Sequence, residues 1–367
     1  MNMKQIFLLL TTFLCLTSTA QEGLKDVLGQ HFLIGATMNQ WQLSKKDSAA
    51  FSVIDRHFNA VVAENVMKMD ALQPSNGVFD FRHADELLEF AQKHHQTLIG
   101  HCLVWHSQVP SWMFIDKEGQ TVSREVLIER MRSHIATVVG HYKGKVHGWD
   151  VVNEAIADDG TMRRSPYYNI IGEEFIEIAF RAAHEADPQA ELYYNDYSMA
   201  NPLKRKAACQ LVKRLKDKGI RIDAVGMQSH VGLNYPDLSD YEATIDSLAA
   251  CGVKVMITEL DINVLPNPNA FGGAAVEQNY EYQQRWNPYV KGLPTSKQQE
   301  LEQRWLALFD IYKRHAQQIT RVNLWGIGDH NSWLNNWPIK GRTNYPLLFD
   351  REYKEKPVIK KIMNLYK

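Results

Sequence analysis

The chain has 367 residues, with 41 Lys and Arg against 42 Asp and Glu and a formal net charge of −1. This balance excludes a protein that binds nucleic acid mainly through a basic surface. The length is enough for a large core, and barrels of this size commonly form one domain.

Residues 1–20 have the pattern of a secretory signal peptide. Lys4 gives a positive start, Ile6–Leu16 an apolar stretch and Ser18–Ala20 the small residues of a cleavage site. The apolar stretch of about 11 residues is too short for the roughly 20 that span a bilayer. We expect cleavage after Ala20, a secreted or periplasmic location and no membrane attachment of the mature chain.

Three cysteines follow the signal segment, namely Cys102, Cys209 and Cys251. An odd, widely spaced set is not a disulfide framework, and no CxxC pair indicates a metal site. Stability is therefore expected to come from packing.

Eight short apolar runs are typical of strands buried on both faces of a parallel sheet. They lie at Leu33–Thr37, Ala60–Val66, Thr97–Val104, Val146–Val152, Glu191–Asn195, Ala224–Met227, Lys254–Glu259 and Arg321–Ile327. Helical patterns lie between or after them, at Ala84–His95, Glu125–Val139, Phe175–Glu185, Pro202–Lys218, Tyr241–Ala250, Glu300–His315 and Val358–Leu365.

This alternation predicts an α/β fold, a (β/α)8 TIM barrel forming a single domain over residues 21–367. A doubly wound open sheet is the alternative, but no Gly-rich phosphate loop follows the first strand. The longest irregular stretch, 263–295, follows the seventh strand. On a barrel such a loop would lie on the rim that carries active sites.

Polar and ionisable residues stand at the end of nearly every predicted strand, which indicates a site at one rim of the barrel. They are Glu64 and Asn65, His101, Asn153 and Glu154, Asn195 and Asp196, Gln228 and His230, and Glu259. Glu154 and Glu259 end strands four and seven, which face each other across a barrel. Such a pair can hydrolyse glycosides if one carboxyl is protonated and the other ionised. Glu64 competes for a catalytic role, but its neighbour Lys68 favours an ionised, sugar-binding group.

Six motifs in chain order resemble those of glycoside hydrolase family 10. Trp149–Ala155 is similar to the acid/base motif and Ile257–Asp261 to the nucleophile motif. The others are Glu64–Lys68, Gly100–His106, Gly226–His230 and Trp325–Asp329 with Ser332 and Trp333. Cys102 departs from the family's more usual Thr. The matches cover essentially the whole chain after residue 20.

The resemblance implies a retaining endo-β-1,4-xylanase with Glu154 as acid/base and Glu259 as nucleophile. In such an enzyme the two carboxyl groups are about 5–5.5 Å apart. His230 would hydrogen-bond Glu259, and Asp261 would orient His230. The implied partners are xylan and xylo-oligosaccharides, bound by a monomer that uses no cofactor and no metal.

The resemblance also implies a set of substrate-binding residues, to which His230 belongs. They are Glu64, Asn65, Lys68 and His101 for the sugar on the non-reducing side, Asn153 for the 2-hydroxyl at the cleavage point, Trp105, Trp325 and Trp333 for the cleft wall, and Tyr194, Asn195 and Gln228 on the acid/base side. Strand alternation leaves open whether Tyr193 or Tyr194 faces the site. Trp112 and Trp337 could extend the binding cleft, but core or rim packing is favoured for both.

Three alternatives compete with this interpretation. A metal-dependent barrel hydrolase could use His101, His106 and His230, although the chain has no HxH or HExxH spacing. A sugar-binding protein on an inactive barrel would usually lack one of the two carboxylates. A hydrolase with the same mechanism could act on β-glucan or short xylosides, and the sequence does not measure the room that decides this.

Overall fold

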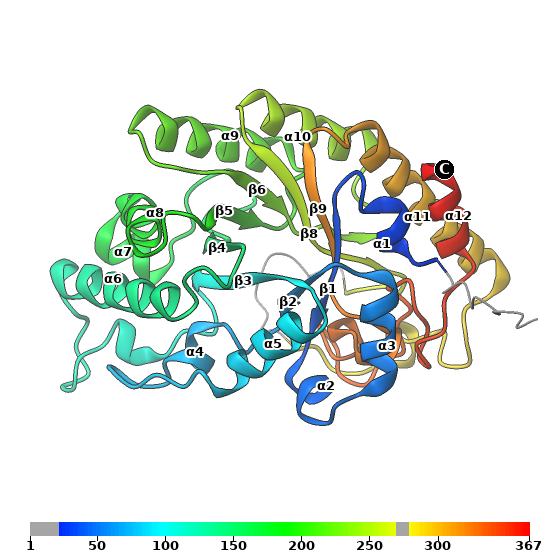
Figure 1. Ribbon diagram of the computed structural model, residues 1–367, viewed down its shortest axis with the longest axis horizontal. Coiled ribbons are helices and arrows are strands. Elements are labelled where there is room, and N and C mark those ends of the chain that lie inside the picture. Colours follow the sequence, from blue (N-terminus) through cyan, green and yellow to red (C-terminus); the bar gives the residue numbers. More distant parts are fainter. Residues whose placement is uncertain (1–21, 269–278) are drawn as a thin grey trace, which may run out of the picture.

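The computed structural model describes residues 22–268 and 279–367 (Figure 1). The predicted signal segment, residues 1–20, and part of the predicted long loop lie outside these ranges. No helix within the described ranges is long and apolar enough to cross a membrane. Cys102, Cys209 and Cys251 are all free thiols.

Eight parallel strands close into a barrel, which confirms the predicted (β/α)8 fold over the open sheet. The strands β1 (Leu33–Met38) to β6 (Ala224–Met227) pair in chain order, and β8 (Lys254–Asn263) and β9 (Ile319–Leu324) close the ring, with β6 paired to β8 and β9 to β1. The remaining strands are β2 (Ala60–Ala63), β3 (Thr97–Val104), β4 (Gly148–Asn153) and β5 (Glu191–Asp196). Closure removes both sheet edges and gathers the carboxyl ends of the strands at one rim.

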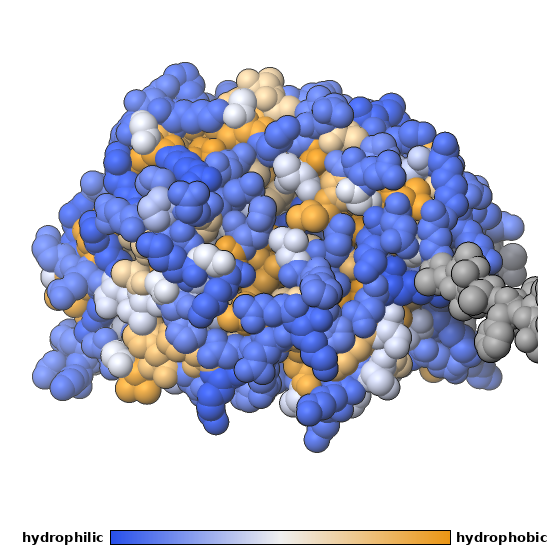
Figure 2. Space-filling model, in the orientation of Figure 1, coloured by the Kyte–Doolittle hydropathy of each residue, from blue (hydrophilic) through white to orange (hydrophobic). Residues whose placement is uncertain are grey.

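Helices surround the barrel on the outside (Figure 1). They are α1 (Leu24–Leu28), α2 (Gln40–Ser44), α3 (Ser48–His57), α4 (Met69–Leu72), α5 (Arg82–Lys93), α6 (Arg124–His141), α7 (Pro166–Ile171), α8 (Glu174–Ala186), α9 (Pro202–Asp217), α10 (Leu238–Ala250), α11 (Thr295–Arg314) and α12 (Val358–Tyr366). The helices α1, α2, α3, α4 and α7 were not predicted from the sequence. The longest of them, α3, has a small buried face formed by Ala50, Val53, Ile54 and His57. The outer surface in this orientation is mostly hydrophilic, with hydrophobic residues in smaller patches (Figure 2).

Two strand boundaries differ from the prediction in a way that shapes the rim. The strand β2 ends at Ala63, so Glu64 and Asn65 lie in the following bend. The strand β8 continues past Glu259 to Asn263 because a short extra strand, β7 (His230–Gly232), pairs with its second half. In this pairing His230 stands opposite Asp261.

Close packing inside the sheet requires glycine at particular positions. A Cβ atom added at Gly100 in β3 would stand 2.1 Å from Cε3 of Trp149, which is almost fully buried. Real carbon atoms pack at about 3.5–4.0 Å. The neighbouring indole fills the space that a side chain at residue 100 would need.

We predict that Gly100→Ala lowers the free energy of unfolding by about 1–3 kcal/mol, the usual cost of overpacking a core. The matched control is Gly140→Ala on α6, where an added Cβ would meet nothing within 4 Å. That change should raise stability by about 0.5–1 kcal/mol because alanine favours helix. Urea unfolding measures both, and equal stabilities would contradict the packing argument.

Candidate active site

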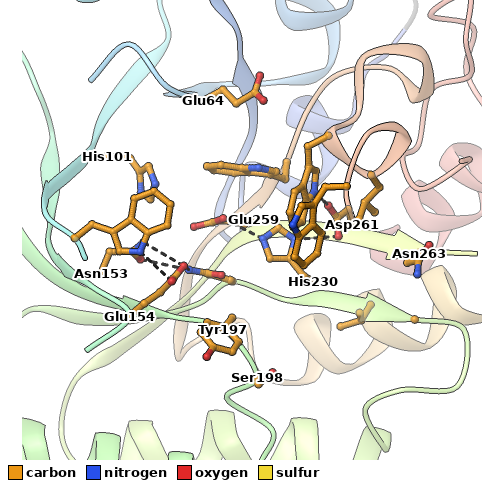
Figure 3. Close-up of a pocket in the computed structure, with 18 of the residues that line it drawn as sticks. Glu64, His101, Asn153, Glu154, Tyr197, Ser198, His230, Glu259, Asp261 and Asn263 are labelled. Atoms are coloured by element: carbon orange, nitrogen blue, oxygen red, sulfur yellow. Dashed lines mark hydrogen bonds and ion pairs between the residues drawn. The ribbon is translucent and has the colours of Figure 1, made fainter. Parts of the chain in front are cut away.

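A cavity of about 650 Å³ opens at the rim where the strands end. All the predicted site residues except Tyr194 and Asn195 line it, and in Figure 3 Glu154 and Glu259 come from separate strands to the same cavity. The predicted residues in its wall are Glu64, Asn65, Lys68, His101, Trp105, Asn153, Glu154, Gln228, His230, Glu259, Asp261, Trp325 and Trp333. Closure of the barrel therefore brings these separate motifs together.

Glu259 lies in the middle of β8 and its side chain is almost fully buried. Nδ2 of Asn195 donates to its Oε1 at 2.8 Å, and Nε2 of His230 lies 3.1 Å from its Oε2. Burial alone would raise the pKa of Glu259, but the hydrogen bond from His230 and the charges of His101 and His230 lower it below the ordinary value. The site thus keeps this carboxylate ionised, as a nucleophile requires.

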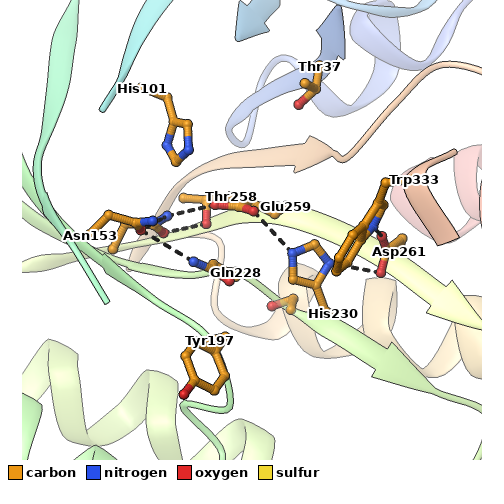
Figure 4. A network of polar contacts seen from close by, with 12 residues as sticks. Thr37, His101, Asn153, Tyr197, Gln228, His230, Thr258, Glu259, Asp261 and Trp333 are labelled. Carbon is orange, nitrogen blue, oxygen red and sulfur yellow. Dashed lines mark hydrogen bonds and ion pairs between the residues drawn. The ribbon is translucent and has the colours of Figure 1, made fainter. Parts of the chain in front are cut away.

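His230 lies between two carboxylates. Its Nδ1 is 3.0 Å from Oδ1 of Asp261, and Nε1 of Trp333 donates to Oδ2 of Asp261 at 2.7 Å (Figure 4). Burial opposes a charge on the ring, yet Asp261 and Glu259 outweigh it and raise the pKa of His230 to about 10. The contacts match those expected, and they make His230 a cation beside Glu259.

Glu154 has a different environment. Nε1 of Trp105 donates to its Oε2 at 2.9 Å, and Nε2 of Gln228 donates to its Oε1 at 2.8 Å. Both donors are neutral. The backbone of Glu154 has φ of 58°, in the left-handed region that residues with a side chain rarely adopt.

A chain of amides connects the two carboxylates beneath the cavity. The Asn153 carboxamide lies 3.0 Å from the amide nitrogen of Asn195, which also donates to Glu259. The hydroxyl of Thr258 donates to the side-chain oxygen Oδ1 of Asn195 at 2.6 Å. The relative placement of Glu154 and Glu259 is therefore fixed by side chains as well as by the strands.

One side of the cavity is formed by the bend after β2. Nζ of Lys68 donates to Asn65 at 3.0 Å and to Gln108 at 2.8 Å, and it lies 4.8 Å from the centroid of the Trp105 ring. Burial raises the pKa of Glu64, and the charge of Lys68 opposes that rise. Gln108 was not predicted as a site residue, although it lies only two residues after the Gly100–His106 motif.

The three histidines considered as metal ligands have separate surroundings. Nδ1 of His101 lies 2.9 Å from Oδ2 of Asp150, and His230 is held by Glu259 and Asp261. The ring of His106 packs edge-on against Trp105 instead, 5.7 Å between centroids. In residues 22–268 and 279–367 no group of three or more His, Cys, Asp or Glu could hold a metal ion.

Tyr194 and Asn195 do not line the cavity, which corrects their prediction as substrate-binding residues. Both are fully buried. The side-chain amide of Asn195 donates to Glu259 beneath the cavity, and not to Glu154, on whose side it was expected. Tyr194 packs in the layer between barrel and helices, while Tyr193 belongs to the cluster inside the barrel. Successive residues of a strand face opposite sides, so only one of the two tyrosines can point inward.

Several residues of the cavity wall were not predicted. Trp337, expected in core or rim packing, lines the cavity and stacks on Trp333 with ring centroids 4.6 Å apart. Trp112 does pack away from it and donates to the Gln73 carbonyl oxygen. The other unpredicted wall residues are Gln108, Asp158, Tyr197, Ser198, Val231, Gly232, Tyr235, Asn263, Asn267 and Leu334. Tyr197 and Ser198 directly follow β5, and this position at a strand end is the signal that could have identified them.

Known proteins resemble this chain over nearly its whole length. The family model of glycosyl hydrolase family 10 matches residues 23–365. Endo-1,4-beta-xylanase A of Xylanibacter ruminicola is 56% identical over 346 residues, covering 94% of each chain. An endo-1,4-beta-xylanase of Geobacillus stearothermophilus is 42% identical over 348 residues, covering 94% of this chain and 98% of that protein.

A solved structure of a GH10 endoxylanase from a sugarcane soil metagenome superposes with a TM-score of 0.90. It is 45% identical in sequence, and the match covers 94% of this chain and all of that one. Sequence and fold therefore point to the same family.

The raised pKa of His230 predicts a pH dependence of stability. The pKa of about 10 in the folded protein exceeds the ordinary 6.5, so protonation of the ring stabilises the fold. This contribution to the free energy of unfolding is fully present below pH 6.5. This contribution is lost as the pH rises through 10. We expect the stability advantage of the wild type over His230→Asn to shrink across that window, measured by urea unfolding at each pH.

The control is His184→Asn, at an exposed position on α8. The difference in free energy of unfolding between this variant and the wild type should change little with pH. An advantage over His230→Asn that stays constant from pH 6.5 to 10 would contradict a charged His230.

Proposed function

The chain belongs to glycosyl hydrolase family 10, and from this membership we propose that it is a retaining endo-1,4-β-xylanase that cleaves internal bonds of xylan. The observation that carries the mechanism is the contrast between its two cavity carboxylates. Glu259 is hydrogen-bonded by a cation, whereas Glu154 is hydrogen-bonded by neutral donors. Such opposed surroundings support Glu259 as the nucleophile and Glu154 as the acid/base.

In the proposed mechanism the reaction takes two displacements. Glu259 attacks the anomeric carbon while the carboxylic acid of Glu154 gives its proton to the departing glycosidic oxygen. The covalent glycosyl-enzyme is then attacked by water, whose proton passes to Glu154, and the sugar leaves with its β configuration. Glu154 returns to its protonated form and Glu259 is released as a carboxylate.

We assign the other cavity residues to sugar binding. We assign Asn153 to the 2-hydroxyl at the cleavage point, while Gln228 donates to the Glu154 carboxyl. The proposed site for the next sugar on the non-reducing side is formed by Glu64, Asn65, Lys68 and His101, and the proposed walls by Trp105, Trp325 and Trp333. A wall of indole faces around polar groups suits a sugar, which has apolar ring faces and polar edges.

We predict that the purified protein releases short xylo-oligosaccharides from unbranched xylan, and none from mixed-linkage β-glucan or cellulose. Products formed early should carry the β anomer, measured by NMR before mutarotation. Activity on a glucan alone would assign another substrate to the same chemistry. Inactivity on all three polymers would favour the sugar-binding alternative.

We further predict that Glu259→Ala lowers kcat on xylan on the order of 10⁴–10⁶-fold, as for loss of an enzymatic nucleophile. Azide distinguishes the two carboxylates, because it enters the space that a truncated side chain leaves. Glu154→Ala should yield the β-glycosyl azide and Glu259→Ala the α anomer, and interchanged products would reverse the assignment. Glu89→Ala, which removes an exposed carboxylate on α5, is the matched control.

We also propose that the protein is exported by cleavage after Ala20 and acts as a monomer, free of the membrane. The charged start, apolar stretch and small residues of segment 1–20 support export. The mass of the exported protein should match a chain beginning at Gln21, and light scattering should give the mass of one chain. A retained signal segment or a dimer mass would contradict the respective proposal.

A further inference from the structure

The backbone of Glu154 needs support from its surroundings. A φ of 58° is unfavourable for a residue with a Cβ atom, so the peptides on either side have to be held in place. On the N-terminal side, the backbone N–H of Glu154 donates to the backbone carbonyl oxygen of Asn195 at 2.9 Å. After it, Nε of Arg163 donates to the Glu154 carbonyl oxygen at 2.8 Å.

The hydroxyl of Tyr194 holds the next two peptides. It accepts from the N–H of Ala155 and from the N–H of Ile156, both at 3.1 Å. It donates in turn to Oδ2 of Asp196. One fully buried hydroxyl thus fixes the direction in which the chain leaves Glu154, without touching the cavity itself.

Asp196 and Lys204 complete this arrangement. Nζ of Lys204, on α9, lies 2.8 Å from Oδ1 of Asp196, and both side chains are fully buried. Burial raises the pKa of Asp196, and the charge of Lys204 opposes that rise. A buried ion pair seldom stabilises a fold more than apolar residues of the same volume would. The pair is therefore better explained by what it orients than by stability.

We infer that Tyr194, Asp196 and Lys204 are positioning residues for Glu154. Lys204 keeps Asp196 in place as a hydrogen-bond acceptor, Asp196 orients the Tyr194 hydroxyl, and that hydroxyl fixes the peptides after Glu154. The inference rests on the proposed role of Glu154 as acid/base. It assigns to α9, outside the barrel, a part in proton transfer at the leaving oxygen.

The test compares two aryl β-xylobiosides. A 2,4-dinitrophenolate leaves without a proton, whereas a 4-methylphenolate needs one, so only the second substrate depends on a well-placed acid. For Tyr194→Phe we expect kcat/KM on the 4-methylphenyl substrate to fall on the order of 10²-fold, as for small misplacements of catalytic groups. On the dinitrophenyl substrate it should stay near the wild-type value.

Tyr193→Phe is the matched control, since it removes the same atom from the neighbouring residue of β5. Its hydroxyl donates to Glu191 at 2.8 Å, and its ring lies in the cluster inside the barrel. Both substrates should react with this variant as with the wild type.

Lys204→Met tests the residue farthest from Glu154 in this arrangement. Its kcat/KM should also fall on the 4-methylphenyl substrate and stay near the wild-type value on the dinitrophenyl substrate. Thermal unfolding checks that each variant is folded. If Tyr194→Phe does not fold, the inference is tested with Lys204→Met alone. Equal losses on both substrates, or no loss, would overturn the inference. Glu154→Ala is the reference, because if it lacks the selective loss then the proposed role of Glu154 itself is wrong.

Discussion

The charge on the buried carboxylate of Glu259 is the constraint around which the rest of the site is arranged. Removing a carboxylate from water costs several kcal/mol unless charge and hydrogen bonds compensate. His230 supplies the charge, and Asn195 supplies a second donor. A histidine beside one carboxylate would still be free to tilt, but Asp261 holds its other nitrogen, and Trp333 holds Asp261. Trp333, in the cavity wall, is thus connected to Glu259 through three successive hydrogen bonds.

The fold supplies this arrangement through one irregularity in an otherwise regular barrel. The strand β8 runs past the point where it pairs with β6 and continues beside the short strand β7. That extension places His230 opposite Asp261 in the register, two residues beyond Glu259. Because residues two apart in a strand face the same side, Glu259 and Asp261 both reach the imidazole. A barrel strand that stopped at Glu259 would leave the histidine without its second partner.

The sequence could identify the site because its chemistry lies at strand ends, where apolar runs stop abruptly and motifs are short. It could not decide which way each strand faced. Tyr193 and Tyr194 are chemically alike, so residue type does not show which of them points into the barrel. The neighbouring strand has a register shift between Asp150 and Val152, so its alternation of inward and outward residues cannot be extended to β5. Gln108 and Trp337 were not predicted as cavity-wall residues for another reason. They lie outside strands and helices, Gln108 with a left-handed φ of 46°, and no periodic pattern sets their direction.

The pairing of buried carboxylates with basic side chains gives Glu259 and Glu154 different surroundings, as their proposed roles require. Glu259 faces His230, Asp196 faces Lys204 and Asp150 faces His101, so each of these carboxylates has a basic partner at hydrogen-bond distance. Trp105 and Gln228, which donate to the Glu154 carboxyl oxygens, carry no charge. In its proposed role as acid/base, Glu154 would release and regain a proton in each turnover, and an adjacent cation that held the carboxyl ionised would prevent this. Neutral donors can fix the direction of the Glu154 carboxyl group. The buried Lys204 acts instead on the backbone beside Glu154, through Asp196 and Tyr194.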